Sequence, residues 1–422
     1  MKARTRILAS SIILLLAFTG LAAYAIHPLL AGYWRDSPSA DPSTERLVDL
    51  GYASWADVSP EDLNKSGVTY YDRRNAYDGL NFYASNTMTK AYLIDMDGRV
   101  VHSWDFNVPT EPWKHVELAD NGNVFLVQYN LWKYDWDSNR LFKFKDGFHH
   151  DIDVSKGGRL YVLRDEYAML DLPEYGLTKA KNNEIQVMLE DGTLLKNISL
   201  HDLVFVKDND LPKKELLKKI VTNEYGENVG PKIREVDGKT IVSNERYDIF
   251  HTNTIEIVHR NITGFAVEGN ALTAVRFLDL ILVVDLDKEE IVWSWGQDDL
   301  QGPHQPTLMD NGNLLIYDNG LSRNYSRIIE LNPLTKQIVW EYTANPPKSF
   351  YSEGMGGSQP LPNGNILITE STKGHAFEIT RGGEIVWDFW NPEMNAEQKK
   401  RSTIYRMTRF SRQQLQEMNI TV

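Results

Sequence analysis

The chain has 422 residues, of which 42% are hydrophobic and 11% aromatic, enough to build a large core. Its 45 basic and 58 acidic residues give a formal charge of −13, which argues against nucleic acid or an anionic membrane surface as the main partner. Cysteine is absent, so disulfide bonds, thiolate nucleophiles and cysteine-ligated metals are excluded.

The N-terminus combines a basic flank with a mostly apolar run from Ile7 to Ile26. This pattern predicts a transmembrane signal-anchor helix within residues 1–30, followed by a linker and N-terminal extension at 31–80. The triplet Ala23-Tyr24-Ala25 also satisfies the small-x-small cleavage rule, so a removable signal peptide is the alternative. Either interpretation predicts an extracytoplasmic protein, on the periplasmic or extracellular face, and the first predicts membrane anchoring.

Residues 81–395 contain a repeat built from short strands. Each unit has a turn glycine followed by an apolar run, as at Gly122, Gly158, Gly312 and Gly364, with a degenerate copy at Gly269. Each unit ends in another apolar segment, four times with a tryptophan: Trp104, Trp293, Trp340 and Trp387, the last three at intervals of 47 residues. A period of about 40–50 residues is typical of propeller blades, so we expect these tryptophans to pack between blades.

Terminal strands fall near residues 102, 143, 196, 293, 340 and 387, which predicts an all-β fold, a six-bladed β-propeller. The long gap before residue 293 indicates an insertion at 204–250 that contains a charged helix. Residues 396–422 form a C-terminal segment, in which 403–410 could supply a strand that closes the ring onto the first blade.

Three histidines occupy one phase of the repeat. His150 and His304 each lie eight residues before a turn glycine, and His251 opens the matching segment of a third unit. Because equivalent positions converge on the axis of a propeller, we expect these histidines to share a site at one mouth of the channel. Arg276 follows the second strand of the His251 unit and should lie at the same mouth, whereas His115 is one residue out of phase and is interpreted as structural.

Clustered imidazoles beside a guanidinium permit two chemistries. Neutral imidazoles can bind a metal ion, although the arginine would oppose the cation. Alternatively, arginine and protonated histidine can bind a tetrahedral oxyanion, while a neutral histidine attacks sulfur or phosphorus. We favour the anion.

Several segments, in this order and spacing, resemble the bacterial arylsulfotransferase family over about residues 67–410. They are the opening Gly67 to Trp104, His149-His150-Asp151-Ile152, the stretch from His251 to Ile255, the stretch from His304 to Gly320, and Leu361 to Ile368. The resemblance implies a six-bladed propeller that moves a sulfuryl group from an aryl sulfate to a phenol, without the adenosine-linked sulfate donor. The sequence implies no stably bound cofactor and no metal, and a metal ion on the histidines stays the alternative.

When the roles of the family's site residues are transferred to the matching positions of this sequence, the resemblance implies that His304 is the nucleophile that becomes sulfated. It makes His251 and Arg276 ligands of the sulfuryl oxygens. His150 would complete the anion cage and protonate the leaving phenolate, whose pKa is about 10.

The chain departs from the family pattern in two ways: residues 31–80 leave little room for an N-terminal β-sandwich, and no disulfide can form. Three alternatives stay open. Water could replace the phenol, which would make the protein a sulfatase. A non-catalytic, membrane-anchored binding or scaffold module needs no chemistry, but it also has no need of three converging imidazoles. A quinoprotein-type propeller lacks support, because its tryptophan docking motif and acidic metal cluster are not apparent.

Overall fold

The computed structural model describes residues 54–108, 114–145, 147–155, 157–173, 176–222, 232–236, 239–243 and 248–422. The predicted anchor at Ile7–Ile26 lies outside these residues. Within the described part, no helix is both long enough and apolar enough to cross a lipid bilayer. The predicted helix of the insertion is α3 (Lys213–Thr222), which is followed by a two-stranded sheet of β14 (Lys232–Val236) and β15 (Lys239–Ser243).

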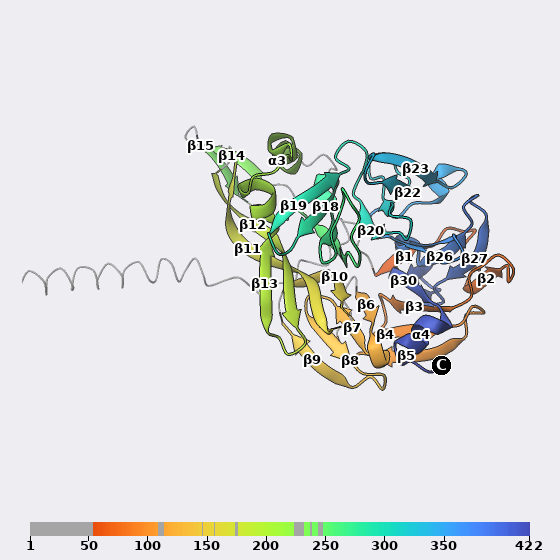
Figure 1. Ribbon diagram of the computed structural model, residues 1–422. Coiled ribbons are helices and arrows are strands. Elements are labelled where there is room, and N and C mark those ends of the chain that lie inside the picture. Colours follow the sequence, from red (N-terminus) through yellow and green to blue (C-terminus); the bar gives the residue numbers. More distant parts are fainter. Residues whose placement is uncertain are drawn as a thin grey trace, which may run out of the picture. The chain divides into compact units, whose positions relative to one another are not determined.

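The fold is all-β and propeller-like, and its main elements are six antiparallel sheets (Figure 1). Each has four main strands, which follow chain order except in the first sheet, where the C-terminal β30 lies beside β3. The first four sheets have these strands: β30 (Ile404–Phe410), β3 (Leu80–Ser85), β4 (Lys90–Ile94) and β5 (Val100–Asp105); β6 (His115–Leu118), β7 (Val124–Val127), β8 (Leu131–Tyr134) and β9 (Arg140–Phe144); β10 (Phe148–Val154), β11 (Arg159–Leu172), β12 (Gly176–Leu189) and β13 (Leu194–Ser199); β16 (Thr252–Ile257), β17 (Ala271–Val275), β18 (Leu280–Asp285) and β19 (Glu290–Trp295). The last two have β20 (His304–Leu308), β21 (Leu314–Asp318), β22 (Arg327–Asn332) and β23 (Gln337–Tyr342); β24 (Gly357–Pro360), β25 (Ile366–Glu370), β26 (His375–Ile379) and β27 (Ile385–Trp390).

Strands from the two ends of the described chain pair with strands distant in sequence. The C-terminal β30 pairs with β3 and completes the first sheet. Near the N-terminus, β2 (Gly67–Tyr71) adds to β27 as a fifth strand of the sixth sheet, and β1 (Trp55–Asp57) joins β29 (Lys400–Ser402) and β28 (Met394–Asn395). The chain ends in the short helix α4 (Arg412–Glu417), which begins at a capping box formed by Ser411 and Gln414.

The turn glycines explain why the first and second strands of the second to sixth sheets pair as hairpins. Gly312 and Gly364 both have φ of +87°, a left-handed conformation that a residue with a Cβ adopts only with strain. Asparagines beside them support the turns, because Asn311 and Asn363 accept hydrogen bonds from the backbone amides of Asn313 and Asn365.

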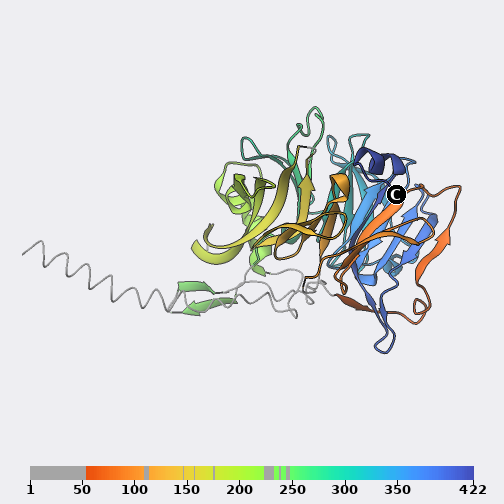
Figure 2. The same cartoon turned by 90° about the horizontal axis from the view of Figure 1, so that it is seen from below.

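The first strands of the six sheets contact one another in a closed series, β6 to β10, β16, β20, β24, β30 and back to β6. These inner strands run in the same direction: Asp151 and Asp153 of β10 accept hydrogen bonds from the backbone amides of Ile255 and Ile257 of β16, at 3.1 and 2.7 Å. Their N-terminal ends therefore lie at one mouth of the ring and their C-terminal ends at the other. Figure 2 shows β1 and α4 on opposite sides: β1 pairs with β29, which directly precedes the start of β30, and α4 follows the end of β30.

Tryptophans of the outer strands connect neighbouring sheets. The indole N–H of Trp104 donates to the Gly122 carbonyl of the second sheet at 3.2 Å. In the same way Trp293 donates to Pro333, Trp340 to Arg381 and Trp387 to Met96, each at 3.0 Å and each on the next sheet around the ring. A buried indole contributes apolar area and needs a partner for its N–H, and the next sheet supplies both.

Candidate functional site

Three histidines lie where neighbouring inner strands begin, at the same mouth of the ring. His304 is the first residue of β20, His251 immediately precedes β16, and His150 is the third residue of β10. Arg276 directly follows β17 and opens the short helix η3 (Arg276–Leu278). All four are deeply buried, with exposed fractions of 1% for His304, 4% for His251 and His150, and 0% for Arg276.

The backbone is irregular at each of the three histidines. The pairing of each inner strand with its neighbour shifts register there, between Phe148 and Ile152, between Thr252 and Thr254, and between His304 and Thr307. His150 and His251 themselves have φ of +58° and +48°. Bulges re-aim side chains, and left-handed angles in non-glycine residues concentrate at functional sites. The irregular backbone at these positions therefore directs the three imidazoles into the mouth, which a regular strand would not do.

The structure brings all four predicted residues together. The rings of His150 and His251 have centroids 4.8 Å apart, and the backbone amide of Arg276 donates to the His251 carbonyl at 3.3 Å. Besides burial, the positive charge of Arg276 lowers the pKa of both His251 and His304. The other two imidazoles likewise lower the pKa of His150. The mouth is thus a small volume that holds three imidazoles and one guanidinium.

His304 is held through Nδ1, which lies 2.8 Å from Oδ1 of Asn319 and 3.2 Å from the carbonyl of Gly302. Burial, followed by the charge of Arg276, lowers the pKa of His304 to about 3. The imidazole is therefore neutral throughout the physiological range.

His251 is paired with a carboxylate. Its Nδ1 lies 3.0 Å from Oδ2 of Asp248, and its backbone N–H donates to Oδ1 of the same residue at 2.9 Å. Burial lowers the pKa of His251, although Asp248 opposes that shift. Burial alone would raise the pKa of Asp248. Lys181 and His251 outweigh that effect and hold the pKa of Asp248 below its usual value.

His150 contacts the closing strand of the ring. The hydroxyl of Tyr405, on β30, lies 3.4 Å from Nδ1 of His150, and the two rings are stacked. Burial, and next the neighbouring His251, lower the pKa of His150 well below its ordinary value.

Other histidines of the described residues have structural partners. Nε2 of His149 lies 2.9 Å from Asp165, and Nε2 of His115 lies 3.1 Å from Asp151. His375 lies between Glu370 and Asp388, at 2.8 and 2.6 Å, and these carboxylates raise its pKa against the opposing effect of burial.

Three further residues of the site were not singled out from the sequence: Asn319, Asp248 and Tyr405. A signal for Asn319 exists, because Asn319 and Arg276 each lie seven residues after a turn glycine, Gly312 and Gly269. Asp248 and Tyr405 have no such signal, since one precedes its strand and the other lies on the closing strand.

The arrangement suits an oxyanion that undergoes nucleophilic attack. A buried guanidinium attracts the anion, and neutral imidazoles supply nucleophilic nitrogen and proton-transfer groups. In the described part of the chain, no cluster of three or more histidine, aspartate or glutamate side chains is arranged to hold a metal ion.

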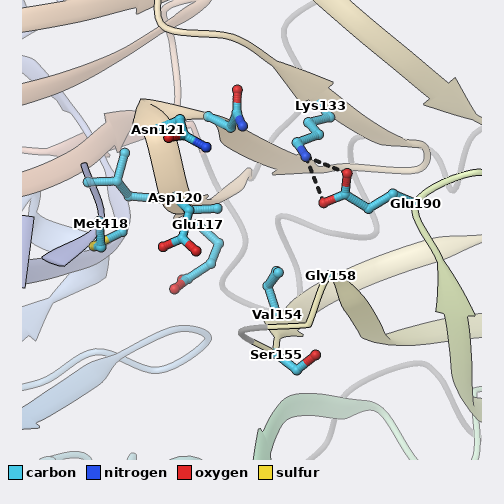
Figure 3. Close-up of a pocket in the computed structure, with 12 residues that line it drawn as sticks. Glu117, Asp120, Asn121, Lys133, Val154, Ser155, Gly158, Glu190 and Met418 are labelled. Atoms are coloured by element: carbon cyan, nitrogen blue, oxygen red, sulfur yellow. Dashed lines mark hydrogen bonds and ion pairs between the residues drawn. The ribbon is translucent and has the colours of Figure 1, made fainter. Parts of the chain in front are cut away.

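A separate cavity of about 330 Å³ lies at the opposite ends of β6 and β10 (Figure 3). Its walls include Glu117, Asp120, Ser155 and Met418, together with the ion pair of Lys133 and Glu190, whose Nζ lies 2.6 Å from both carboxylate oxygens. The last residues of β6 and β10, Leu118 and Val154, line the cavity, whereas His150 lies near the start of β10, so the cavity is separate from the histidine mouth.

Solved structures that resemble the chain are distant in sequence. A protein of unknown function from Bacteroides caccae has 13% identity and a TM-score of 0.48, over 79% of this chain and 99% of its own. Catalytically inactive virginiamycin B lyase from Staphylococcus aureus with quinupristin has 10% identity and a TM-score of 0.43, over 81% of this chain and 89% of its own. The β-propeller domain of Cps50 (Swd1) from Myceliophteria thermophila has 9% identity and a TM-score of 0.43, over 81% and 97%.

No curated protein matches the sequence. A family model described as arylsulfotransferase (ASST) matches residues 130–392, which is more than half of the chain and includes His150, His251, Arg276 and His304. The protein therefore belongs to the arylsulfotransferase family.

Proposed function

We propose that the six sheets are the blades of one six-bladed propeller, and that its histidine mouth transfers a sulfuryl group from an aryl sulfate to a phenol through a sulfohistidine at His304. The observation that carries the proposal is the meeting of a neutral, buried His304 with Arg276 and two further imidazoles. Membership of the family supports sulfotransfer in general.

In the first half-reaction, Nε2 of His304 attacks the sulfur of the aryl sulfate. The N–S bond forms as the S–O bond to the aryl group breaks, and the phenolate leaves with the bonding electrons. Its pKa of about 10 makes protonation favourable, and the proposed acid is the imidazolium form of His150. The negative charge of a bound sulfate ester would stabilise that imidazolium next to it.

In the second half-reaction, the oxygen of an acceptor phenol attacks the sulfur of sulfo-His304. The N–S bond breaks, its electrons return to the imidazole, and the now neutral His150 accepts the phenol proton. Arg276 and His251 bind the sulfuryl oxygens in both steps, where charge develops in a site without bulk water. No adenosine-linked donor takes part in this scheme.

A chromogenic assay tests the scheme. The full chain is incubated with an aryl sulfate that releases a coloured phenol, with and without a phenolic acceptor, alongside His304→Ala and the control His201→Ala. His201 is also buried, but it bonds to Asp202 and the Asp171 carbonyl outside the mouth. We expect acceptor-dependent release that is lost in His304→Ala and retained in His201→Ala. A sulfated His304 peptide should be found when the enzyme is denatured and digested at alkaline pH, where the N–S bond persists.

Other outcomes have definite meanings. Release that does not depend on the acceptor would indicate a sulfatase, and no release across a panel of aryl sulfates would favour a non-catalytic binding module.

We further propose that residues 7–26 anchor the enzyme in the membrane, with its catalytic part outside the cytoplasm. The basic flank and apolar run support this. Fractionation of cells that carry the tagged full chain tests it, since recovery of all the protein in the cytosol would contradict it.

A further inference from the structure

The proposed attack by His304 has a requirement that burial alone does not meet. A neutral imidazole carries one proton, and only the nitrogen without it has a lone pair for attack on sulfur. The hydrogen-bond partner of Nδ1 determines which of the two ring nitrogens carries the proton: an acceptor at Nδ1 places the proton there.

Asn319 is oriented so that its oxygen, and not its nitrogen, faces His304. The Nδ2 group of Asn319 donates to the carbonyls of Ser352 at 2.7 Å and Met355 at 3.0 Å. A flipped amide would place Oδ1 against both carbonyl oxygens, which repel it. Oδ1 therefore lies 2.8 Å from Nδ1 of His304, and the Gly302 carbonyl at 3.2 Å is a second acceptor at the same nitrogen.

The backbone holds Asn319 in this place. It directly follows β21, and its carbonyl accepts a hydrogen bond from the Ser326 hydroxyl at 3.0 Å. The adjacent Asp318 accepts from the amide of Gln301 at 2.8 Å, and Gly320 donates to the Gln301 carbonyl at 2.9 Å. Gln301, three residues before His304, is thus hydrogen-bonded to both neighbours of Asn319, and these bonds hold Asn319 next to the imidazole of His304.

The partners of His251 and His304 differ in charge. Asp248 is a carboxylate, whose negative charge favours an imidazolium at His251, whereas Asn319 is a neutral acceptor at Nδ1 of His304. The hydrogen bond to Asn319 raises the pKa of His304, but burial and the charge of Arg276 outweigh it, so the ring stays neutral. The charges of Arg276 and His251 also act on His304. The guanidinium of Arg276 has only donors and cannot accept the Nδ1 proton, and Nδ1 of His251 is paired with Asp248.

We propose that Asn319 is a positioning residue for sulfuryl transfer: it fixes the proton of His304 on Nδ1, so that the lone pair for attack lies on Nε2, and unlike a carboxylate it adds no negative charge that would favour protonation of the ring. This proposal rests on the proposed function for its role, but the tautomer itself can be observed without any substrate.

The first test is the ¹⁵N spectrum of histidine-labelled full-length protein, with His304→Ala to assign the ring signals. We expect protonated Nδ1 and unprotonated Nε2 in the unsubstituted protein, and a shift toward protonated Nε2 in Asn319→Leu. Asn365→Leu is the matched control, because Asn365 is also buried and its amide also donates twice, to the Asn75 carbonyl and to Glu378. A proton on Nε2 in the unsubstituted protein, or an unchanged tautomer in Asn319→Leu, would overturn the proposal.

The second test is kinetic. In Asn319→Leu we expect kcat to fall about 10²- to 10⁴-fold, as when a catalytic histidine is held in the wrong tautomer, with KM changed about twofold or less. In Asn319→Asp the Nδ1 proton keeps an acceptor, but the carboxylate favours the imidazolium, so the acid limb of kcat/KM should move to higher pH. If Asn319→Leu does not fold, the same displacement in Asn319→Asp, seen in the ¹⁵N titration of His304, decides the question.

The two tests separate the proposals. An Nδ1-protonated His304 that depends on Asn319, in a protein without sulfotransfer, would leave the positioning role of Asn319 standing and refute the proposed function. A full kcat in Asn319→Leu would refute the positioning role alone.

Discussion

Asp248 supports both the backbone and the ring of His251. One of its oxygens accepts the His251 backbone N–H, and the other lies against Nδ1. His251 has φ of +48°, a conformation that costs a non-glycine residue about 1–3 kcal/mol. The hydrogen bonds to the Asp248 carboxylate offset part of that cost. The carboxylate also raises the pH at which the imidazole of His251 becomes a cation.

Replacement of Asp248 should weaken donor binding in a pH-dependent way. Asp248 favours the imidazolium, so Asp248→Asn should lower the pKa of His251 further, and the cation proposed to bind the sulfuryl oxygens should form less readily. We expect KM for the aryl sulfate to rise about tenfold near neutral pH, the equivalent of one pKa unit. Because low pH restores the imidazolium, the difference should be small in acid and grow as the pH rises; KM measured from pH 5.5 to 9 checks this.

The control for Asp248→Asn is Asp202→Asn. Asp202 is likewise paired with a histidine, at 2.9 Å from Nδ1 of His201, but outside the mouth. An equal rise in KM in both variants, or a difference that does not vary with pH, would contradict the role given to Asp248.

At the scale of the elements, neighbouring inner strands are joined by side chains that occupy the same position in each repeat. Asp153 of β10 and Gln359 of β24 each lie five residues before a turn glycine, and Glu256 of β16 is their counterpart. Each accepts a hydrogen bond from a backbone amide of the next inner strand: Ile257 at 2.7 Å, Arg409 at 2.7 Å and Leu308 at 2.8 Å. Two of these acceptors are carboxylates in a buried setting, and one is an amide.

The carboxylates should make the fold less stable in base. Burial raises the pKa of Glu256 from 4.5 to about 8, so the fold favours its protonated form. The resulting stability is complete below the unfolded pKa and is lost as the pH rises through about 8. Glu256→Gln keeps the acceptor, as Gln359 does, and should be more stable than the parent at pH 8 by about 2–4 kcal/mol, in urea unfolding at pH 5, 7 and 8.

The stabilisation by Glu256→Gln should shrink as the pH falls toward 5. Glu290→Gln, on the exposed edge of β19, serves as the control and should change little at any pH. A Glu256→Gln variant that is less stable than the parent at pH 8 would show that the carboxylate is ionised and needed there.

Much of the element order follows from local sequence. Turn glycines locate the hairpins, and the predicted terminal strands near 102, 143, 196, 293, 340 and 387 each fall on the fourth strand of a sheet. The phase of His150, His251 and His304 likewise follows from the repeat. The partners Asn319, Asp248 and Tyr405 do not, because each depends on a hydrogen bond across a bulge, a turn or the closing strand.

At the scale of the whole molecule, the ring closes between the sixth and first sheets. Trp387 of β27 donates to the Met96 carbonyl beyond β4. Arg409 of β30 forms a buried ion pair with Glu378 of β26, and it also donates to Asn81 at 2.7 Å and to the Tyr77 carbonyl at 3.0 Å. A buried charge that loses its partner is costly, so this contact is sensitive to change.

Arg409→Met should destabilise the protein strongly, because it leaves the Glu378 carboxylate buried without its cation. We expect a loss of about 3–5 kcal/mol in urea unfolding, and a partial recovery in the double variant Arg409→Met/Glu378→Gln. The single variant Glu378→Gln completes the cycle. Additive effects of the two substitutions would mean that the pair does not couple the first and last sheets.

The pairing of β30 with β3 has a consequence for biosynthesis. Residues are added from the N-terminus, so the strand that completes the first sheet is among the last to be made. Until then β3 presents an unpaired edge, the kind of surface that recruits chaperones and proteases or aggregates. The same late strand brings Tyr405 to His150. A chain cut short by a premature stop codon would therefore lack Tyr405 at the histidine mouth and be open to degradation, and only full-length copies would accumulate with the proposed catalytic centre complete.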